Sequence, residues 1–226
     1  MTTRVYLVRH GATDLLVEDR FAGSTDVPLS DEGREQVRRL ARRLASQPIV
    51  AFYASPMDRT METAAILAEP HRRDVHPRDG FKEVNLGHWE GMKRHEVERL
   101  YPEEYARWET DPFSYAPKGG ESGLAVTARA LPELLEIVAV HENKHVLIAS
   151  HKATLRLLIS MLLGFDPRSY RDRLDQSPAA LNILDFKDPT RARLTLFNDT
   201  SHYSEDRAAI PSQPTERLSR WWDRSG

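Results

Sequence analysis

The chain contains no cysteine, so disulfide bonds, thiolate nucleophiles and cysteine-ligated metal sites are excluded. It also lacks an apolar run near the roughly 20 residues that cross a bilayer, and we expect no membrane partner. The N-terminal residues lead directly into an apolar strand without the pattern of a signal peptide, which favours a cytoplasmic protein.

The chain also has no large excess of positive or negative charge. The formal net charge of −2 provides no basic field, so the composition does not support a nucleic-acid partner. Most of the cations are arginines, whose planar guanidinium suits bidentate binding of phosphate or carboxylate. With 40% hydrophobic and 29% charged residues, the composition is ordinary for a globular enzyme with a substantial core.

Apolar runs alternate with segments of helical period along most of the chain. Helix signals begin at Ser30, after Ser55 as an expected N-cap with Pro56 at the first helical position, near residue 121, and after His151 with Gly164 as the C-cap. This alternation predicts an α/β fold: a three-layer α/β/α architecture with a mostly parallel central sheet. The strands are expected at 5–8, 48–54, 145–149, 179–186 and 192–197.

We expect one domain over residues 1–205, followed by a polar tail over 206–226. Within the domain, residues 81–120 have little regular signal but many aromatic side chains, which favours a segment that covers an active site. The tail ends in Trp221-Trp222, and an exposed pair of this kind would suggest an interface, for example in a homodimer.

Two histidines occupy equivalent places, each directly after a predicted strand. His10 follows the first strand, and His151 follows the strand at 145–149 and opens a helix. Ligands of open α/β sheets bind at the carboxyl ends of the strands, so both side chains could line one crevice. Together with Arg9, Arg59 and the helix N-terminus, the histidines describe a pocket for an anion, and phosphate suits it best.

The order of several short motifs resembles the histidine phosphatase superfamily, the phosphoglycerate-mutase-like group, over about residues 4–203. The resemblance implies the phosphoglycerate-mutase-like fold and no cofactor. The blocks that carry it are Arg9-His10-Gly11, Asp26 to Ser30 with Gly33, Ser55 to Ala64, Glu83 with Gly87 and Trp89-Glu90-Gly91, Gly119 to Ser122, Ser150-His151, and Asn198 to His202.

Transferred to this sequence, the resemblance implies His10 as the nucleophile that carries the phosphoryl group. It implies Arg9, Arg59 and His151 as the groups that hold the phosphoryl oxygens, and Glu83 as the proton donor and acceptor. A neutral imidazole is a competent nucleophile near pH 7, and two guanidinium groups can stabilise the charge of the transferring phosphoryl group. A metal site at these histidines is disfavoured, because the two arginines would place fixed positive charge beside a cation.

The sequence departs from the family pattern at three positions. Ala12 stands where Glu or Gln is frequent, and Leu16 stands where an asparagine often contacts the phosphate. Arg20 and Thr25 are candidates to replace that contact. Lys152 stands where small residues are frequent, and it either binds a second anionic group of the substrate or faces solvent.

The length of the chain favours a compact phosphatase that hydrolyses a small phosphorylated metabolite. Two alternatives remain at this point: a mutase that returns the phosphate to the substrate, and a non-catalytic protein that binds a phosphorylated ligand. The second is disfavoured by the presence of all five residues of the implied catalytic set.

Overall fold

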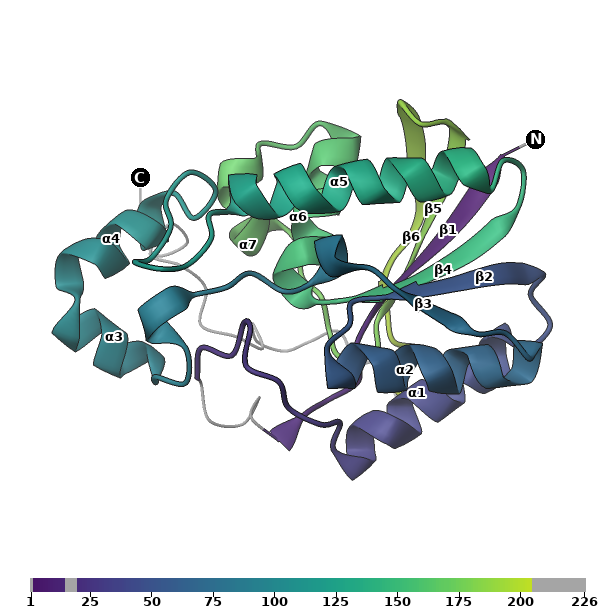
Figure 1. The fold of residues 1–226 in the computed structure, drawn as a ribbon, viewed down its shortest axis with the longest axis horizontal. Helices are drawn as coiled ribbons and strands as arrows, with labels where there is room; N and C mark the ends of the chain where they lie inside the picture. The colour runs from purple at the N-terminus through teal and green to yellow at the C-terminus, as the bar shows by residue number, and fades with distance from the viewer. Residues whose placement is uncertain (1, 15–19, 205–226) are drawn as a thin grey trace.

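The computed structural model describes residues 2–14 and 20–204. A six-stranded sheet has the order β3-β2-β4-β1-β5-β6 and forms the centre of the molecule (Figure 1). Strands β3, β2, β4 and β1 run parallel, whereas β5 is antiparallel to both of its neighbours. The strands are β1 (Thr3–Arg9), β2 (Ile49–Ala54), β3 (Val75–Pro77), β4 (His145–Ser150), β5 (Leu181–Asp188) and β6 (Arg191–Asp199).

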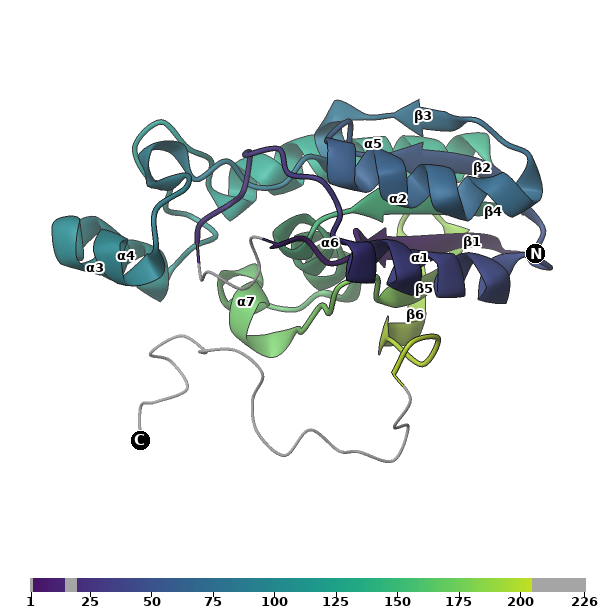
Figure 2. The same cartoon turned by 90° about the horizontal axis from the view of Figure 1, so that it is seen from below.

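The α-helices of the described residues cover both faces of the sheet and extend beyond one end of it. Helices α1 (Asp31–Leu44) and α2 (Asp58–Ala68) pack together on one face of the sheet, and α5 (Gly123–Val140) and α6 (Lys152–Leu163) pack together on the other (Figures 1 and 2). The short helix α7 (Tyr170–Arg173) follows α6, and α3 (Arg94–Leu100) and α4 (Pro102–Thr110) project beyond the end of the sheet.

Alternation of side chains along β1 explains the three layers. Val5 and Leu7 join the core beneath α5 and α6, whereas Tyr6 and Val8 join the core beneath α1 and α2. Both sets are buried, because a parallel strand in the middle of such a sheet is covered on both faces. The predicted three-layer, mostly parallel fold is therefore confirmed.

Local capping chemistry sets some of the helix boundaries. The Ser30 hydroxyl accepts a 3.0 Å hydrogen bond from the Gly33 amide and caps α1, and Gly164 ends α6 in the left-handed conformation, as predicted. The prediction of Ser55 as the N-cap of α2 is wrong, because Met57 is the N-cap. The Ser55 amide still bonds to the Ala149 carbonyl at 3.1 Å and extends the sheet, so the helix starts only after the chain has turned.

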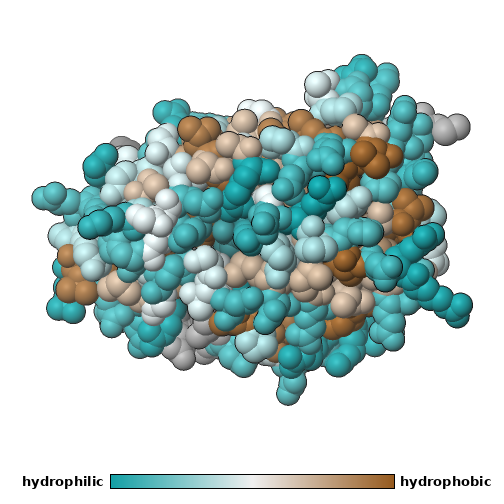
Figure 3. Space-filling model, in the orientation of Figure 1, coloured by the Kyte–Doolittle hydropathy of each residue, from teal (hydrophilic) through white to brown (hydrophobic). Residues whose placement is uncertain are grey.

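Residues 81–120 carry α3 and α4 and pack around an aromatic cluster of their own. The rings of Trp89 and Trp108 pack edge to face with 5.7 Å between their centroids, and Phe21 contacts both rings. We call residues 81–120 the cover. The face of the molecule in Figure 3 is mostly hydrophilic with scattered apolar side chains. No helix in the described part of the chain has the length and apolarity needed to cross a membrane.

Candidate active site

Three parallel strands bring the candidate residues to one edge of the sheet. The last residues of β1 and β4, Arg9 and Ser150, are paired in register, and the His10 amide donates to the Ser150 carbonyl at 3.0 Å. The same edge carries Ser55 after β2 and His151 after β4. The pairing of the strands therefore determines which side chains meet there.

A close approach of two backbone segments explains the glycine of the Arg-His-Gly motif. A Cβ atom on Gly11 would lie 2.6 Å from the carbonyl oxygen of Gly33, within the first turn of α1. Real Cβ atoms do not tolerate this distance, so a side chain at position 11 would push the His10 loop away from the helix.

The His10 ring is buried and its tautomer is fixed. Its Nδ1 atom lies 2.8 Å from the Gly11 carbonyl oxygen, which can only accept, so Nδ1 carries the proton and Nε2 keeps its lone pair. Burial lowers the pKa of His10 well below its ordinary value, and the neighbouring charges of Arg9 and Arg59 lower it further. The ring is thus held as a neutral imidazole with one nitrogen available to a ligand.

His151 lies beside His10, with 5.3 Å between the ring centroids. Its Nε2 atom is 2.8 Å from the Ser55 hydroxyl oxygen, and its buried Nδ1 atom has no hydrogen-bond partner among the described residues. Burial, with the charge of Arg59, lowers the pKa of His151 well below its ordinary value. A buried nitrogen without a partner is costly, which fits a site that an external ligand completes.

Arg9 and Arg59 are 4% and 2% exposed, and carbonyl groups orient both guanidinium groups. Arg9 donates to the Gln176 carbonyl at 2.5 Å, and Arg59 donates to the carbonyls of Gly23 and Thr25, each at 2.9 Å. Burial lowers the pKa of Arg59. Two buried cations thus lie beside two neutral imidazoles, and Asp26 approaches the Arg59 guanidinium at 3.8 Å.

The loop that holds Arg59 is itself fixed by Glu90 of the cover. One Glu90 oxygen accepts from the Ser24 amide at 2.9 Å, and the other accepts from the Thr25 hydroxyl at 2.9 Å. The Thr25 carbonyl therefore contacts Arg59, while the Thr25 side chain points to Glu90. The guanidinium of Arg20 donates to the Gly91 carbonyl at 2.8 Å.

Glu83 caps the N-terminus of α6, next to His151. Its Oε2 accepts from the Ala153 amide at 3.0 Å, and its Oε1 accepts from the Thr154 amide at 3.2 Å. Its backbone is also fixed, because Arg129 donates to the Glu83 and Lys82 carbonyls at 3.1 and 2.8 Å. The carboxylate also interacts electrostatically with Arg59.

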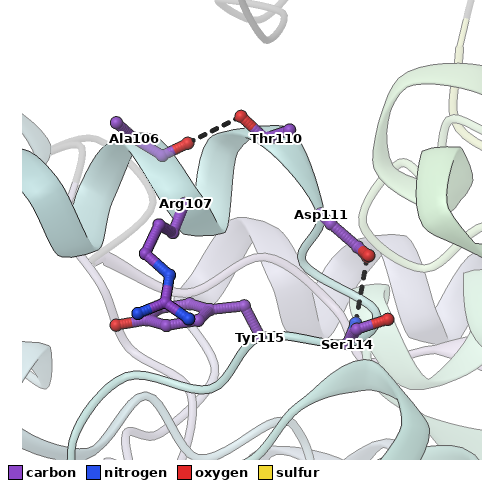
Figure 4. Close-up of a pocket in the computed structure, with 6 residues that line it drawn as sticks. All are labelled: Ala106, Arg107, Thr110, Asp111, Ser114 and Tyr115. Carbon is purple, nitrogen blue, oxygen red and sulfur yellow. Dashed lines mark hydrogen bonds between the residues drawn. The ribbon is translucent and has the colours of Figure 1, made fainter.

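A cavity of about 190 Å³ is lined by Glu83 and by Lys152. The structure thus places Lys152 beside the site, in the first turn of α6. A second hollow of about 450 Å³ lies on the outer side of α4, where the Arg107 guanidinium stacks on the Tyr115 ring (Figure 4). None of the residues that line this second hollow is a predicted site residue.

Sequence reasoning missed several contributors to the site. Ser55 belonged to a recognised motif, but its contact with His151 depends on the pairing of β2 with β4. Arg94, Arg156 and Arg171 line the cavity without any local signal in the sequence. Leu16 and Trp221-Trp222, for which we made predictions, lie outside the described residues. Among the described residues, no three His, Asp or Glu side chains are grouped to hold a metal ion.

Known proteins provide an independent comparison. Residues 5–200 match the family described as histidine phosphatase superfamily (branch 1). Phosphoserine phosphatase 1 of Hydrogenobacter thermophilus is 34% identical over 163 residues, which cover 72% of this chain and 77% of that protein. Glucosyl-3-phosphoglycerate phosphatase of Mycolicibacterium vanbaalenii is 32% identical over 168 residues, which cover 71% and 74%.

Solved structures agree with the sequence relatives. YhfR of Bacillus stearothermophilus superposes with a TM-score of 0.83 at 30% identity, over 88% of this chain and 98% of that one. A mycobacterial glucosyl-3-phosphoglycerate phosphatase superposes with a TM-score of 0.79 at 27% identity, over 88% and 99%. The predicted resemblance is confirmed: the chain belongs to the histidine phosphatase superfamily, branch 1.

Proposed function

We propose that the protein is a phosphatase that hydrolyses a small phosphate monoester through a phosphohistidine at His10. The observation that carries the proposal is the state of the His10 ring, which is buried and neutral and has its Nδ1 proton on the Gly11 carbonyl at 2.8 Å. Its Nε2 is therefore the nucleophile. The names of the two sequence relatives support hydrolysis of a phosphorylated metabolite.

In the first step, the lone pair of His10 Nε2 forms the N–P bond and the bond between phosphorus and the ester oxygen breaks. Arg9, Arg59 and the Nδ1 side of His151 bind the phosphoryl oxygens. Their positive charge and hydrogen bonds stabilise the transition state, because phosphoryl transfer depends mainly on positioning and electrostatic stabilisation. Arg20 and Thr25 remain candidates for a further contact with the phosphate.

Glu83 supplies the proton that the leaving alkoxide needs. Its Oε2 accepts one hydrogen bond, from the Ala153 amide, and so keeps room for a proton directed at the substrate. After the alcohol leaves, the carboxylate takes a proton from the attacking water. The hydroxide oxygen bonds to phosphorus, the N–P bond breaks, and phosphate leaves with Glu83 protonated again.

Replacement of the nucleophile tests this proposal directly. His10→Ala should lower kcat/KM for p-nitrophenyl phosphate more than about 1,000-fold, because no other group can carry the phosphoryl intermediate. His95→Ala, a change at an exposed histidine of α3, is the matched control and should keep the wild-type rate. Hydrolysis by His10→Ala at the control rate across a pH series would refute the mechanism.

The same assays separate hydrolysis from mutase chemistry. With 3-phosphoglycerate and a 2,3-bisphosphoglycerate primer, a phosphatase releases inorganic phosphate, whereas a mutase isomerises the substrate without release. We further predict a cytoplasmic location and a homodimer. Cell fractionation and the mass measured by light scattering, respectively, test these two predictions.

A further inference from the structure

The main chain of residues 80–83 lies outside the strands of the described sheet. Side chains from α5, α6 and β4 donate instead to all four of its carbonyl groups. Hydroxyl groups supply two of these bonds, from Ser150 to Phe81 and from Thr154 to Lys82, each at 2.8 Å. Arg129 of α5 supplies the other three, so a single side chain holds most of the segment that ends at Glu83.

The guanidinium group of Arg129 uses all five of its N–H donors. Its Nη1 atom donates to the carbonyls of Gly80 and Lys82, at 2.6 and 2.8 Å, and its Nη2 atom donates to the Glu83 carbonyl at 3.1 Å. The two remaining N–H groups bind the two carboxylate oxygens of Glu121, at 2.8 and 2.9 Å. The group is therefore fixed between a carboxylate on one side and three carbonyls on the other.

Glu121 belongs to the motif Gly119 to Ser122, to which the proposed mechanism gives no role. Its carboxylate accepts from the Asn85 amide at 3.0 Å, and its own amide donates to the Asn85 carbonyl at 2.7 Å. Burial raises the pKa of Glu121, but the hydrogen bonds from Arg129 and the Asn85 amide outweigh this effect and lower it. An ionised Glu121 thus holds Arg129 and also anchors the chain two residues beyond the proton donor.

This arrangement separates the main chain of Glu83 from its carboxyl group. Amides of α6 hold the carboxyl oxygens, whereas Arg129 holds the backbone. Because its five donors are engaged elsewhere, Arg129 donates no hydrogen bond to the Glu83 carboxylate. Its charge is also balanced by Glu121, so it does not oppose the protonation that a general acid needs.

We propose that Arg129, held by Glu121, is a positioning residue that places the carboxyl group of Glu83 within reach of the leaving oxygen. This inference rests on the proposed phosphatase function, in which Glu83 donates the proton. Loss of Arg129 removes the side-chain donor of the Gly80 and Glu83 carbonyls. A catalytic group displaced by about 1 Å can lose on the order of 100-fold in rate.

Two esters assayed on the same protein sample test the proposal. Glycerol 3-phosphate needs a proton on its leaving oxygen, whereas p-nitrophenyl phosphate does not. Arg129→Met should lower kcat about 10- to 100-fold for the first ester and less than about threefold for the second. The ratio of the two rates does not depend on the fraction of folded protein, so a loss of stability alone cannot change it.

Arg38→Met removes an exposed arginine of α1 and is the matched control, with both rates unchanged. An equal loss for the two esters in Arg129→Met would overturn the proposal, because it would show that the residue only supports the fold.

Arg129→Lys distinguishes hydrogen-bond geometry from charge. An ammonium group keeps the charge, but it has three donors on one atom and cannot span three carbonyls and a carboxylate. We expect at least a fivefold loss for glycerol 3-phosphate and little change for p-nitrophenyl phosphate. Wild-type rates for both esters in Arg129→Lys would contradict positioning by the guanidinium group.

A double-mutant cycle with Glu83→Gln tests whether Arg129 acts through Glu83. In the Glu83→Gln background, Arg129→Met should cause no further selective loss for glycerol 3-phosphate. If Glu83→Gln is selective but the two losses multiply in the double variant, the proposal for Arg129 fails and the proposed function stands. If Glu83→Gln itself slows both esters equally, the proton-transfer step of the proposed function fails, and the role of Arg129 fails with it.

Discussion

The proposed phosphate pocket differs in construction from the cavity lined by Glu83 and Lys152, which we call the leaving-group cavity. The phosphate pocket, made of Arg9, His10, Arg59 and His151, stands on the ends of strands and the start of α2. Backbone carbonyls hold three of its four side chains: those of Gln176 for Arg9, Gly11 for His10, and Gly23 and Thr25 for Arg59. Because carbonyl partners do not depend on side-chain identity, this geometry persists when neighbouring residues change.

The leaving-group cavity is built mostly from long side chains that contact each other. Arg94, Glu109 and Arg171 come from α3, α4 and α7, and they are held by ion pairs rather than by the sheet. A single substitution in such a set changes charge and shape without moving a strand. The comparison teaches that backbone carbonyls orient the residues proposed for phosphoryl transfer, whereas the walls of the cavity depend on side chains that can be replaced.

Glu83 lines the cavity and is the proposed proton donor, so its substitution tests the comparison most severely. Glu83→Gln should lower kcat about 100- to 10,000-fold for an alkyl phosphate, which needs a proton on its leaving oxygen. The loss should be much smaller for p-nitrophenyl phosphate, because nitrophenolate leaves without protonation. Steady-state kinetics with both esters measures the difference.

Glu103→Gln provides the matched control for this substitution. Glu103 is exposed in the first turn of α4, and its replacement should leave both rates unchanged. An equal loss of activity for both esters in Glu83→Gln would show that the residue supports the structure of the α6 N-terminus and does not transfer a proton.

Ser55 tests whether the phosphate pocket needs side-chain as well as backbone support. Its hydroxyl is 2.8 Å from His151 Nε2, in a fully buried place. Ser55→Ala should free the His151 ring and lower kcat/KM about 10- to 100-fold, through a misplaced phosphate contact. Inhibition by inorganic phosphate should weaken in parallel.

A merely structural role for Ser55 would give a different result. The thermal stability would fall, but the inhibition constant for phosphate and the pH profile of kcat/KM would remain those of the wild type. Ser114→Ala, at an exposed serine after α4, is the matched control and should alter none of these quantities.

Local sequence signals were sufficient for most of the fold, and they predicted the residues proposed for the phosphate pocket. The run Val5 to Val8 reads as a strand buried on both faces, and Ser30 reads as a cap, because both signals depend on neighbouring residues only. Strand β3 was missed, since its three residues include His76 and Pro77 and are too few to show a period. The order of the motifs predicted the residues of the pocket, because these motifs follow a strand or begin a helix.

The leaving-group cavity could not be predicted in this way. Arg94, Arg156 and Arg171 are far apart in the sequence and resemble the other surface arginines of the chain. Only the packing of the cover against α6 and α7 brings them to one space. Lys152 attracted attention through its departure from the family pattern, which was the one signal of this cavity in the sequence.

The smallest expected effect is on the pH dependence of the free energy of unfolding. Burial lowers the pKa of His10 and His151, and burial lowers that of His202 to about 4. These rings stay neutral in the folded state, whereas in the unfolded state they bind protons below about pH 6.5. The unfolded state then holds more protons, so the free energy of unfolding must fall as the pH is lowered below that value. The slope approaches about 1.4 kcal/mol per pH unit for each such histidine.

Urea denaturation between pH 7.5 and 5.0 measures this slope. In His10→Gln the slope below pH 6.5 should become shallower by the contribution of one histidine, while the carboxylates contribute equally to both proteins and cancel. An unchanged slope in His10→Gln would mean that the folded state accepts a proton on His10 as readily as the unfolded chain does. The burial of the His10 ring would then not hold it neutral, and the proposed nucleophile would need another group to keep its Nε2 lone pair free.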